Sequence, residues 1–232
     1  MDMENNREEH LRWKTLVFDL DGTLLDTIDD LKNSVNHALR SAGLPERSRD
    51  EVLLFVGNGI KNLIHRAVPE GTDEALEAKV FSLFKEHYLV HCEDMTAPYP
   101  GIMELLGKLK DSGAKCAIVS NKNDVPVKKL SEKYFGDLID IAIGENEAAG
   151  IAKKPAPDTV YEALKQLEAK PEEAVYIGDS EVDYATAKNA GLPVILVGWG
   201  FRKKEALLAM EPDYFAEDPA SLEHIMLIST QS

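Results

Sequence analysis

The sequence predicts an α/β fold: a Rossmann-like, mostly parallel sheet with helices on both faces, and an all-α helical domain inserted into it. Three observations lead to this prediction. Short runs rich in valine and isoleucine recur along the chain, as expected for strands buried on both faces. Amphipathic helical segments separate these runs, which is the alternation of an α/β domain. A helix-rich stretch, residues 27–97, interrupts the alternation directly after the first strand.

The α/β part divides into strands and helices of ordinary length. Gly113 and Gly191 each follow an amphipathic run and predict the end of a helix there. The last segment, residues 212–226, is expected to add an edge strand and a final helix. The predicted strands are residues 15–20, 115–120, 138–143, 174–177 and 194–197, and the predicted helices between them are residues 101–112, 157–167 and 183–190.

The inserted stretch has helical periodicity and a clear helix start. Ser48 and Glu51 form the S-x-x-E pattern of a capping box, in which each residue bonds the other's backbone N–H. The sequence Pro98-Tyr99-Pro100-Gly101 then marks the return to the α/β part. We expect a helical cap of residues 27–97 over a core of residues 12–26 and 98–232, with hinges near residues 26–28 and 96–99.

Composition narrows the classes of partner. The chain has 232 residues, which suits one sizeable domain with an inserted module. Its 41 acidic and 26 basic residues give a formal net charge of −15, which would repel nucleic acid and anionic membrane surfaces. We therefore expect no nucleic-acid or membrane partner. A phosphate ester would also be repelled, so a phosphate site here needs local positive charge from a few lysines, a cation and backbone N–H groups.

Cysteine usage and hydropathy favour a cytoplasmic protein. Cys92 and Cys116 lie in unlike contexts and form no disulfide framework. The first residues are charged, with neither the apolar run of a signal peptide nor that of a membrane span. The sequence leaves the oligomeric state open between a monomer and a homodimer.

Two carboxylates follow the first predicted strand. Ligands of open parallel sheets bind beyond the carboxyl ends of the strands, and Asp19, Ser120 and Asp179 all stand at such ends. In Asp19-Leu20-Asp21, one carboxylate can face the substrate while the other reaches the leaving group, and the glycine that follows supplies the freedom for the turn. This pattern favours nucleophilic attack by one aspartate with its neighbour as general acid and base. A solvated acidic turn is the alternative for this pair considered alone.

A second carboxylate pair lies where a later strand passes into a helix. Asp179 and Asp183 are four residues apart in GDSEVD, so both face one side of the helix. Hard oxygen ligands of this kind suit Mg²⁺, which takes one or two protein carboxylates and keeps several waters. The alternative is an ordinary helix N-cap with acidic residues in the first turn.

Two further segments offer groups for a phosphoryl oxygen. Lys154 lies in KKPAPD, where prolines stiffen the loop, and its ammonium could relieve repulsion between carboxylates. The hydroxyl of Ser120 and the N–H of Asn121 could bind an oxygen of the same group. A solvated lysine and a serine in a turn are the alternatives.

Taken in order, the segments VFDLDGTLLD, VSNK, KKPAPD and YIGDSEVD resemble the haloacid dehalogenase superfamily, in its phosphatase branch with a helical cap after the first motif. The resemblance implies that Asp19 is the nucleophile and Asp21 the acid and base. It also implies a Mg²⁺ cofactor with Asp19, Asp21 (through its backbone carbonyl), Asp179 and Asp183 at the metal. Phosphoryl or substrate binding is then expected from Ser120, Asn121, Lys154 and Thr23.

The cap sequence resembles that of one group within this superfamily. VGNGIKNLIHRAV and PYPGI resemble the phosphoglycolate phosphatases of this superfamily, so the expected substrate is a small phosphorylated metabolite, 2-phosphoglycolate first. Gly57, Asn58 and Gly59 are candidate substrate contacts because glycines allow close approach, and Arg66 could meet a substrate carboxylate. A turn between two cap helices is the alternative for the glycines. A β-phosphoglucomutase-like phosphomutase, a pyrophosphatase and a non-catalytic phosphate-binding regulatory protein with the same fold stay open.

Overall fold

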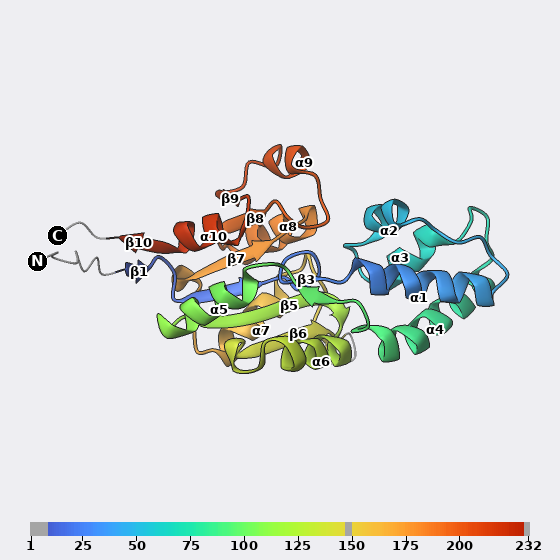
Figure 1. Cartoon of the computed structure of the whole chain (residues 1–232), viewed down its shortest axis with the longest axis horizontal. Helices are drawn as coiled ribbons and strands as arrows, with labels where there is room; N and C mark the ends of the chain where they lie inside the picture. The colour runs from blue at the N-terminus through green and yellow to red at the C-terminus, as the bar shows by residue number, and fades with distance from the viewer. Residues whose placement is uncertain (1–8, 147–149, 230–232) are drawn as a thin grey trace, which may run out of the picture.

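The computed structural model describes residues 9–146 and 150–229 and has a six-stranded, entirely parallel central sheet. The sheet order is β6-β5-β2-β7-β8-β9, so the first strand of the sheet lies near its middle (Figure 1). The α/β prediction is confirmed. These strands are β2 (Thr15–Phe18), β5 (Lys115–Asn123), β6 (Ile141–Glu145), β7 (Ala174–Gly178), β8 (Val194–Val197) and β9 (Tyr214–Ala216).

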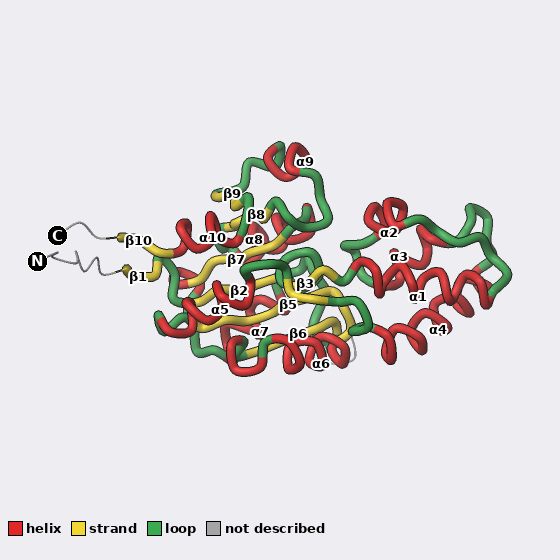
Figure 2. The backbone as a smooth tube through the Cα atoms, viewed as in Figure 1, coloured by secondary structure: helices red, strands yellow, loops and turns green. Residues whose placement is uncertain are grey.

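Helices cover both faces of the sheet (Figure 2). Because side chains alternate along a strand, Leu16 and Phe18 of β2 enter one apolar core and Val17 enters the other. On the Phe18 side pack α5 (Ile102–Asp111), α6 (Asp124–Tyr134) and α10 (Pro219–Met226). On the Val17 side pack α7 (Asp158–Gln166), α8 (Glu181–Ala190) and α9 (Lys204–Leu208).

Four helices between the first two strands of the sheet form a separate body, seen at one end of the molecule in Figure 1. The capping box that the sequence predicts at Ser48 is present, with Glu51 as its partner. Leu39, Ile64 and Phe84 are fully buried at the centre of this helical cap. The helices are α1 (Ile28–Ser41), α2 (Arg49–Phe55), α3 (Ile60–Ala67) and α4 (Glu74–His91).

The two connections between cap and core lie side by side. They pair as a short antiparallel ladder of β3 (Leu25–Asp26) and β4 (Ala97–Pro98). Buried Asp30, in the first turn of α1, accepts hydrogen bonds from the backbone N–H groups of Met95 and Thr96. Both connections are thus fixed to each other, which suits a common pivot for the cap.

The remaining elements are short. Strands β1 (Glu9–Leu11) and β10 (Leu227–Ser229) pair antiparallel beside the core, and short 3₁₀ turns span Gly136–Leu138 and Pro171–Glu173. Strand β5 extends three residues beyond the predicted end at Ser120, and it is followed by α6, which was not predicted. Cys92 and Cys116 are buried free thiols that form no disulfide. Within the described ranges, no helix has both the length and the apolar character that crossing a membrane requires.

Candidate active site

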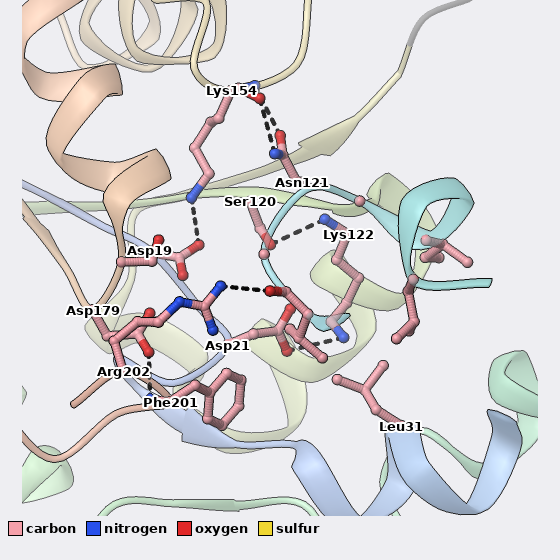
Figure 3. Close-up of a pocket in the computed structure, with 16 residues that line it drawn as sticks. Asp19, Asp21, Leu31, Ser120, Asn121, Lys122, Lys154, Asp179, Phe201 and Arg202 are labelled. Atoms are coloured by element: carbon pink, nitrogen blue, oxygen red, sulfur yellow. Dashed lines mark hydrogen bonds and ion pairs between the residues drawn. The ribbon is translucent and has the colours of Figure 1, made fainter. Parts of the chain in front are cut away.

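One cavity lies between the cap and the carboxyl ends of the sheet strands, with a volume of about 60 Å³. Figure 3 shows its core side, where Asp19, Lys154, Asp179 and Ser120 converge although they are far apart in the sequence. The cap contributes apolar side chains to the opposite wall. The residues that line it are Asp19, Asp21, Leu31, Val56, Gly57, Gly59, Ile60, Leu63, Ser120, Asn121, Lys122, Lys154, Asp179, Ser180, Phe201 and Arg202.

Asp19 follows β2 and is bound by a buried lysine. The Nζ of Lys154 lies 2.6 Å from Oδ1 of Asp19 and 2.8 Å from Oδ1 of Asp183. Burial opposes the charged form of Lys154, but the carboxylates of Asp183 and Asp19 outweigh it and raise its pKa. The lysine is therefore a fixed cation at the centre of the acidic cluster.

Asn121 holds the backbone that carries this lysine. Its Nδ2 donates to the Lys154 carbonyl at 3.0 Å, and its Oδ1 accepts from the Lys154 N–H at 2.8 Å. The side chain of Asn121 is thus engaged with the Lys154 loop and positions that lysine. Ser120 lies next to it on β5, buried, with its Oγ accepting from the Lys122 N–H at 3.2 Å.

Asp183 is saturated with hydrogen bonds. Its Oδ1 accepts from Lys154 and from the hydroxyl of Tyr176 at 3.0 Å. Its Oδ2 accepts from the Ser180 hydroxyl at 2.6 Å and from the Asp179 N–H at 3.2 Å. A carboxylate offers about four lone-pair sites, so these four bonds use the acceptor capacity of Asp183.

Asp21 points into the cavity from the turn after Asp19. Its Oδ1 accepts from the Thr27 hydroxyl at 2.6 Å and lies 3.0 Å from the Nζ of Lys122. Lys122 is buried and also donates to the hydroxyl of Tyr88 on cap helix α4. Burial opposes the charged form of Lys122, but the charge of Asp21 and the hydroxyl of Tyr88 outweigh this effect and raise the pKa of the lysine. The cap thereby reaches the carboxylate of Asp21 through one lysine.

The acidic cluster carries more negative charge than its lysine balances. Oxygens of Asp19, Asp179 and Asp183 lie within 4.8 Å of one another, and all three residues are buried. Burial, with repulsion from Asp183 and Asp21, raises the pKa of Asp19 to about 7 despite Lys154. Burial and the charges of Asp183 and Asp19 also raise the pKa of Asp179. An all-oxygen donor set with excess charge is what a hard divalent cation requires, so these residues fit one.

Gly22 makes the approach of Asp179 possible. It has a φ of +85°, and a Cβ built on it would lie 2.3 Å from Oδ2 of Asp179. The same Oδ2 accepts from the Phe201 N–H at 2.6 Å. Any side chain at position 22 would therefore displace this carboxylate.

The structure brings most of the predicted residues to the cavity. Gly57 and Gly59 line it from the cap, whereas Asn58, Thr23 and Asp183 are not among the described residues that do. Thr23 is fully buried, and its Oγ1 has no hydrogen-bond partner among the described residues. Arg66 lies on the exposed side of α3 and donates to the Phe55 carbonyl at 3.3 Å.

Four residues of the site were not predicted from the sequence: Lys122, Tyr176, Tyr88 and Arg202. Lys122 had a usable signal, because it is two residues beyond Ser120 and an extended strand points both side chains to one face. The other three become site residues only through packing between distant segments.

A family model described as haloacid dehalogenase-like hydrolase matches residues 16–197 of this chain. The chain belongs to this family. The matched range runs from the strand before Asp19 to the end of β8, and so it includes all four motifs and the cap.

Relatives of this haloacid dehalogenase-like hydrolase extend over nearly its whole length. The phosphoglycolate phosphatase of Aquifex aeolicus is 31% identical over 214 residues, covering 92% of this chain and 96% of that protein. The phosphoglycolate phosphatase of Vibrio vulnificus is 33% identical over 225 residues, covering 93% and 97%. Such coverage includes both the core and the cap.

Solved structures agree with the fold of this hydrolase. A Lactobacillus delbrueckii protein assigned as a phosphoglycolate phosphatase superposes with a TM-score of 0.87 at 33% identity, covering 93% of this chain and 98% of that one. CbbY from Rhodobacter sphaeroides, solved in complex with phosphate, has a TM-score of 0.72 at 25% identity, covering 90% and 96%. The predicted family and the predicted fold with its helical cap are confirmed.

Proposed function

We propose that this protein is a Mg²⁺-dependent phosphatase that hydrolyses a small phosphate monoester, 2-phosphoglycolate, through an aspartyl phosphate on Asp19. One observation carries the proposal: two neighbouring carboxylates each have Oδ1 engaged by a buried lysine, Lys154 for Asp19 and Lys122 for Asp21. Neither Oδ2 accepts a hydrogen bond from the described residues, so each carboxylate keeps one oxygen for chemistry in the same small cavity.

In the first step, Oδ2 of Asp19 attacks phosphorus and the bond from phosphorus to the ester oxygen breaks. Asp21 gives its proton to the departing alkoxide, which leaves as glycolate. In the substrate-free structure the three N–H donors of Lys154 bond Asp19, Tyr176 and Asp183. Lys154 would give up one of these bonds to a non-bridging oxygen, the Ser120 hydroxyl would bind another, and both would stabilise the charge that spreads over the phosphoryl group. The Thr27 hydroxyl and Lys122 keep Asp21 oriented toward the leaving group.

In the second step, the Asp21 carboxylate takes a proton from water, and the water oxygen attacks phosphorus. The bond from phosphorus to Asp19 breaks and inorganic phosphate leaves. The roles of Asp21 in the two steps are opposite, so the proton that it gives to the alkoxide is replaced by the proton that it takes from water, and each turnover returns it to its starting state. The apolar cap wall formed by Leu31, Val56 and Leu63 would limit bulk water to the molecule that reacts.

The carboxylates of Asp19 and Asp179, with the backbone carbonyl of Asp21, would hold the Mg²⁺. When bound, the cation offsets the negative charge of the phosphoryl group and of the two carboxylates. Asp183 acts differently in this proposal, because its four hydrogen bonds leave no free acceptor site. It positions Lys154 and the Asp179 backbone and contacts the cation at most through water.

The cap favours a small acidic substrate over a sugar phosphate. Its side chains in the cavity, Leu31, Val56, Ile60 and Leu63, offer no hydrogen bond to a sugar hydroxyl. Helix α3 has Gly59 as its N-cap residue, with no side-chain cap hydrogen bond and no acidic residue in its first turn. Its first N–H groups and dipole suit a carboxylate at the leaving-group end of the substrate.

A panel of phosphate esters with and without Mg²⁺ tests the proposal. We expect release of phosphate from 2-phosphoglycolate, little release from pyrophosphate or hexose phosphates, and no turnover in EDTA. Asp19→Asn should abolish turnover in a protein that still folds, and acid-quenched wild type should carry phosphate on Asp19 by mass spectrometry.

The other outcomes separate the alternatives. Interconversion of hexose phosphate isomers without phosphate release would identify a mutase, and preferred cleavage of pyrophosphate a pyrophosphatase. Binding of phosphate esters with no turnover of any of them would identify a regulatory protein.

A further inference from the structure

The segment Trp199–Arg202, between β8 and α9, contacts three parts of the site at once. The indole Nε1 of Trp199 donates to the Thr23 carbonyl at 2.9 Å, in the loop after the nucleophile. The N–H of Phe201 donates to Oδ2 of Asp179 at 2.6 Å. Arg202 then reaches from the core to the cap. One short piece of backbone therefore connects the nucleophile loop, the acidic cluster and the cap.

The guanidinium of Arg202 joins two bodies. Its Nε and Nη2 contact the two carboxylate oxygens of Glu181, on the core, at 2.9 and 3.2 Å. Its Nη1 donates to the Leu53 carbonyl at 3.1 Å and its Nη2 to the Val56 carbonyl at 2.7 Å, at the end of α2 in the cap. The Arg202 side chain is 17% exposed. A cation at the carbonyl end of a helix is favoured by both hydrogen bonding and the helix dipole.

Gly57 provides the space for this contact. It follows Val56 directly, has a φ of +126°, and a Cβ built on it would lie 2.8 Å from Nη2 of Arg202. In Figure 3, Arg202 and Phe201 extend from beside Asp179 along the cavity toward the cap side. The loop that begins α3 and faces the cavity is thus held directly by the core segment that also holds Asp179.

We propose that Arg202 is a positioning residue that couples closure of the cap to binding of the divalent cation at Asp19 and Asp179. With Arg202 bound to the α2 carbonyls, the Trp199–Arg202 segment is fixed at both ends and keeps the Phe201 N–H on Asp179. When the cap moves away, the segment loses one anchor, and the orientation of Asp179 loosens. The inference rests on the proposed function only in naming the cation as Mg²⁺.

Coupling of this kind is reciprocal. If closure tightens Mg²⁺ binding by some factor, Mg²⁺ favours closure by the same factor. Neither effect requires substrate or turnover, so both can be measured on the substrate-free protein.

Mg²⁺ titration of the full-length protein without substrate is the first test. Trp199 reports on the segment, and the chain's other tryptophan, Trp13, can be removed as Trp13→Phe. We expect Arg202→Met to weaken Mg²⁺ binding about 5- to 10-fold, a typical size for coupled sites. Arg202→Lys, which keeps the charge but not the fork of donors, should recover part of the loss.

The distance between cap and core is the second test. Spin labels on Lys79→Cys, in α4, and Glu172→Cys, in the core, report it without interference from the two buried native cysteines. We expect Mg²⁺ to narrow the distance distribution in the otherwise wild-type protein and to have no such effect in Arg202→Met. Gly57→Ala should reproduce both defects, and the double variant Gly57→Ala/Arg202→Met should add little to either single change.

Arg66→Met is the matched control. Arg66 also donates to a carbonyl at the end of α2, that of Phe55, but it belongs to the cap and joins no second body. We expect it to leave Mg²⁺ affinity and the distance distribution unchanged.

Two outcomes would overturn the inference. Unchanged Mg²⁺ affinity and cap distances in a folded Arg202→Met, with only KM raised, would make Arg202 a direct substrate ligand. If Arg202→Met and Arg66→Met changed Mg²⁺ affinity and the cap–core distances equally, both arginines would act only as caps of α2. A protein without phosphatase activity would refute the proposed function but leave these two measurements decisive for Arg202.

Discussion

Replacing Asp19 by asparagine should stabilise the metal-free protein. Asp19 is buried, and its pKa is raised from 3.8 to about 7 by burial and by the nearby charges of Asp183 and Asp21, against the attraction of Lys154. Between those two values the folded state binds a proton that the unfolded state has released. Stability therefore falls as the pH rises through this window. Asp19→Asn removes the ionisable group, so the variant does not lose stability in this way as the pH rises.

The magnitude follows from the shift in pKa. A shift of about 3 units at 1.36 kcal/mol per unit gives about 4 kcal/mol once the pH exceeds the folded value. About 2 kcal/mol of this loss falls between pH 5.5 and 7.5, by the same relation. In a chain of this size that corresponds to a change in Tm of about 4–8 °C.

Thermal unfolding in EDTA at pH 5.5 and 7.5 is the assay, and the difference in Tm between Asp19→Asn and wild type is the measured quantity. Burial and the neighbouring His37 and His91 lower the pKa of His87, which makes stability rise with pH below 6.5, but this contribution is common to both proteins and cancels. We expect the variant to be more stable at both pH values and by the larger margin at pH 7.5.

Asp30→Asn is the contrasting change. Asp30 is also buried, but it accepts N–H bonds from Met95 and Thr96 and the Thr96 hydroxyl, so its replacement should lower the Tm. The reasoning is refuted if Asp19→Asn is less stable than wild type at pH 7.5 in EDTA. It is also refuted if the margin between the two proteins is the same at both pH values.

Three further changes test individual contacts. Gly22→Ala should lower the free energy of unfolding by the cost of overpacking, about 1–3 kcal/mol, and weaken Mg²⁺ binding, because its Cβ would displace Asp179; an unchanged Mg²⁺ titration would contradict this. Lys122→Met should lower kcat about 10-fold or more with little change in KM, because Asp21 loses a partner in its proton transfer; unaltered kcat would exclude that role. Asp183→Asn should lower kcat at saturating Mg²⁺, whereas Asp179→Asn should mainly weaken Mg²⁺ binding. If the two variants lost Mg²⁺ affinity to the same extent, Asp183 would be a direct ligand.

The sequence predicted the fold and the assembly of the site for a single physical reason. The carboxyl ends of parallel strands share one edge of the sheet, so residues that follow β2, β5 and β7 must meet there. Asp19, Ser120 and Asp179 each follow a recognisable apolar run, and they line one cavity. Their separation in the sequence was no obstacle, because the sheet determines their neighbours.

What could not be predicted depends on contacts between the two bodies. Arg202 lies in a loop with no periodicity, and its partners are backbone carbonyls of α2, which carry no sequence signal. Tyr88 has the spacing of an ordinary buried helix residue, and its link to Lys122 exists only where α4 approaches β5. Helix α6 was not predicted, because the predicted strand ended three residues before the actual end of β5.

The paired ladder of β3 and β4 gives the molecule a modular architecture. Leu25 and Asp26 lie opposite Pro98 and Ala97, so the whole insertion enters and leaves the core at neighbouring points. Another helical insert with equally close ends could replace it without altering the strand order of the sheet. Substrate preference can thus diverge among descendants of such a chain while the reacting aspartates stay in place, provided that the exchanged insert still accepts Arg202.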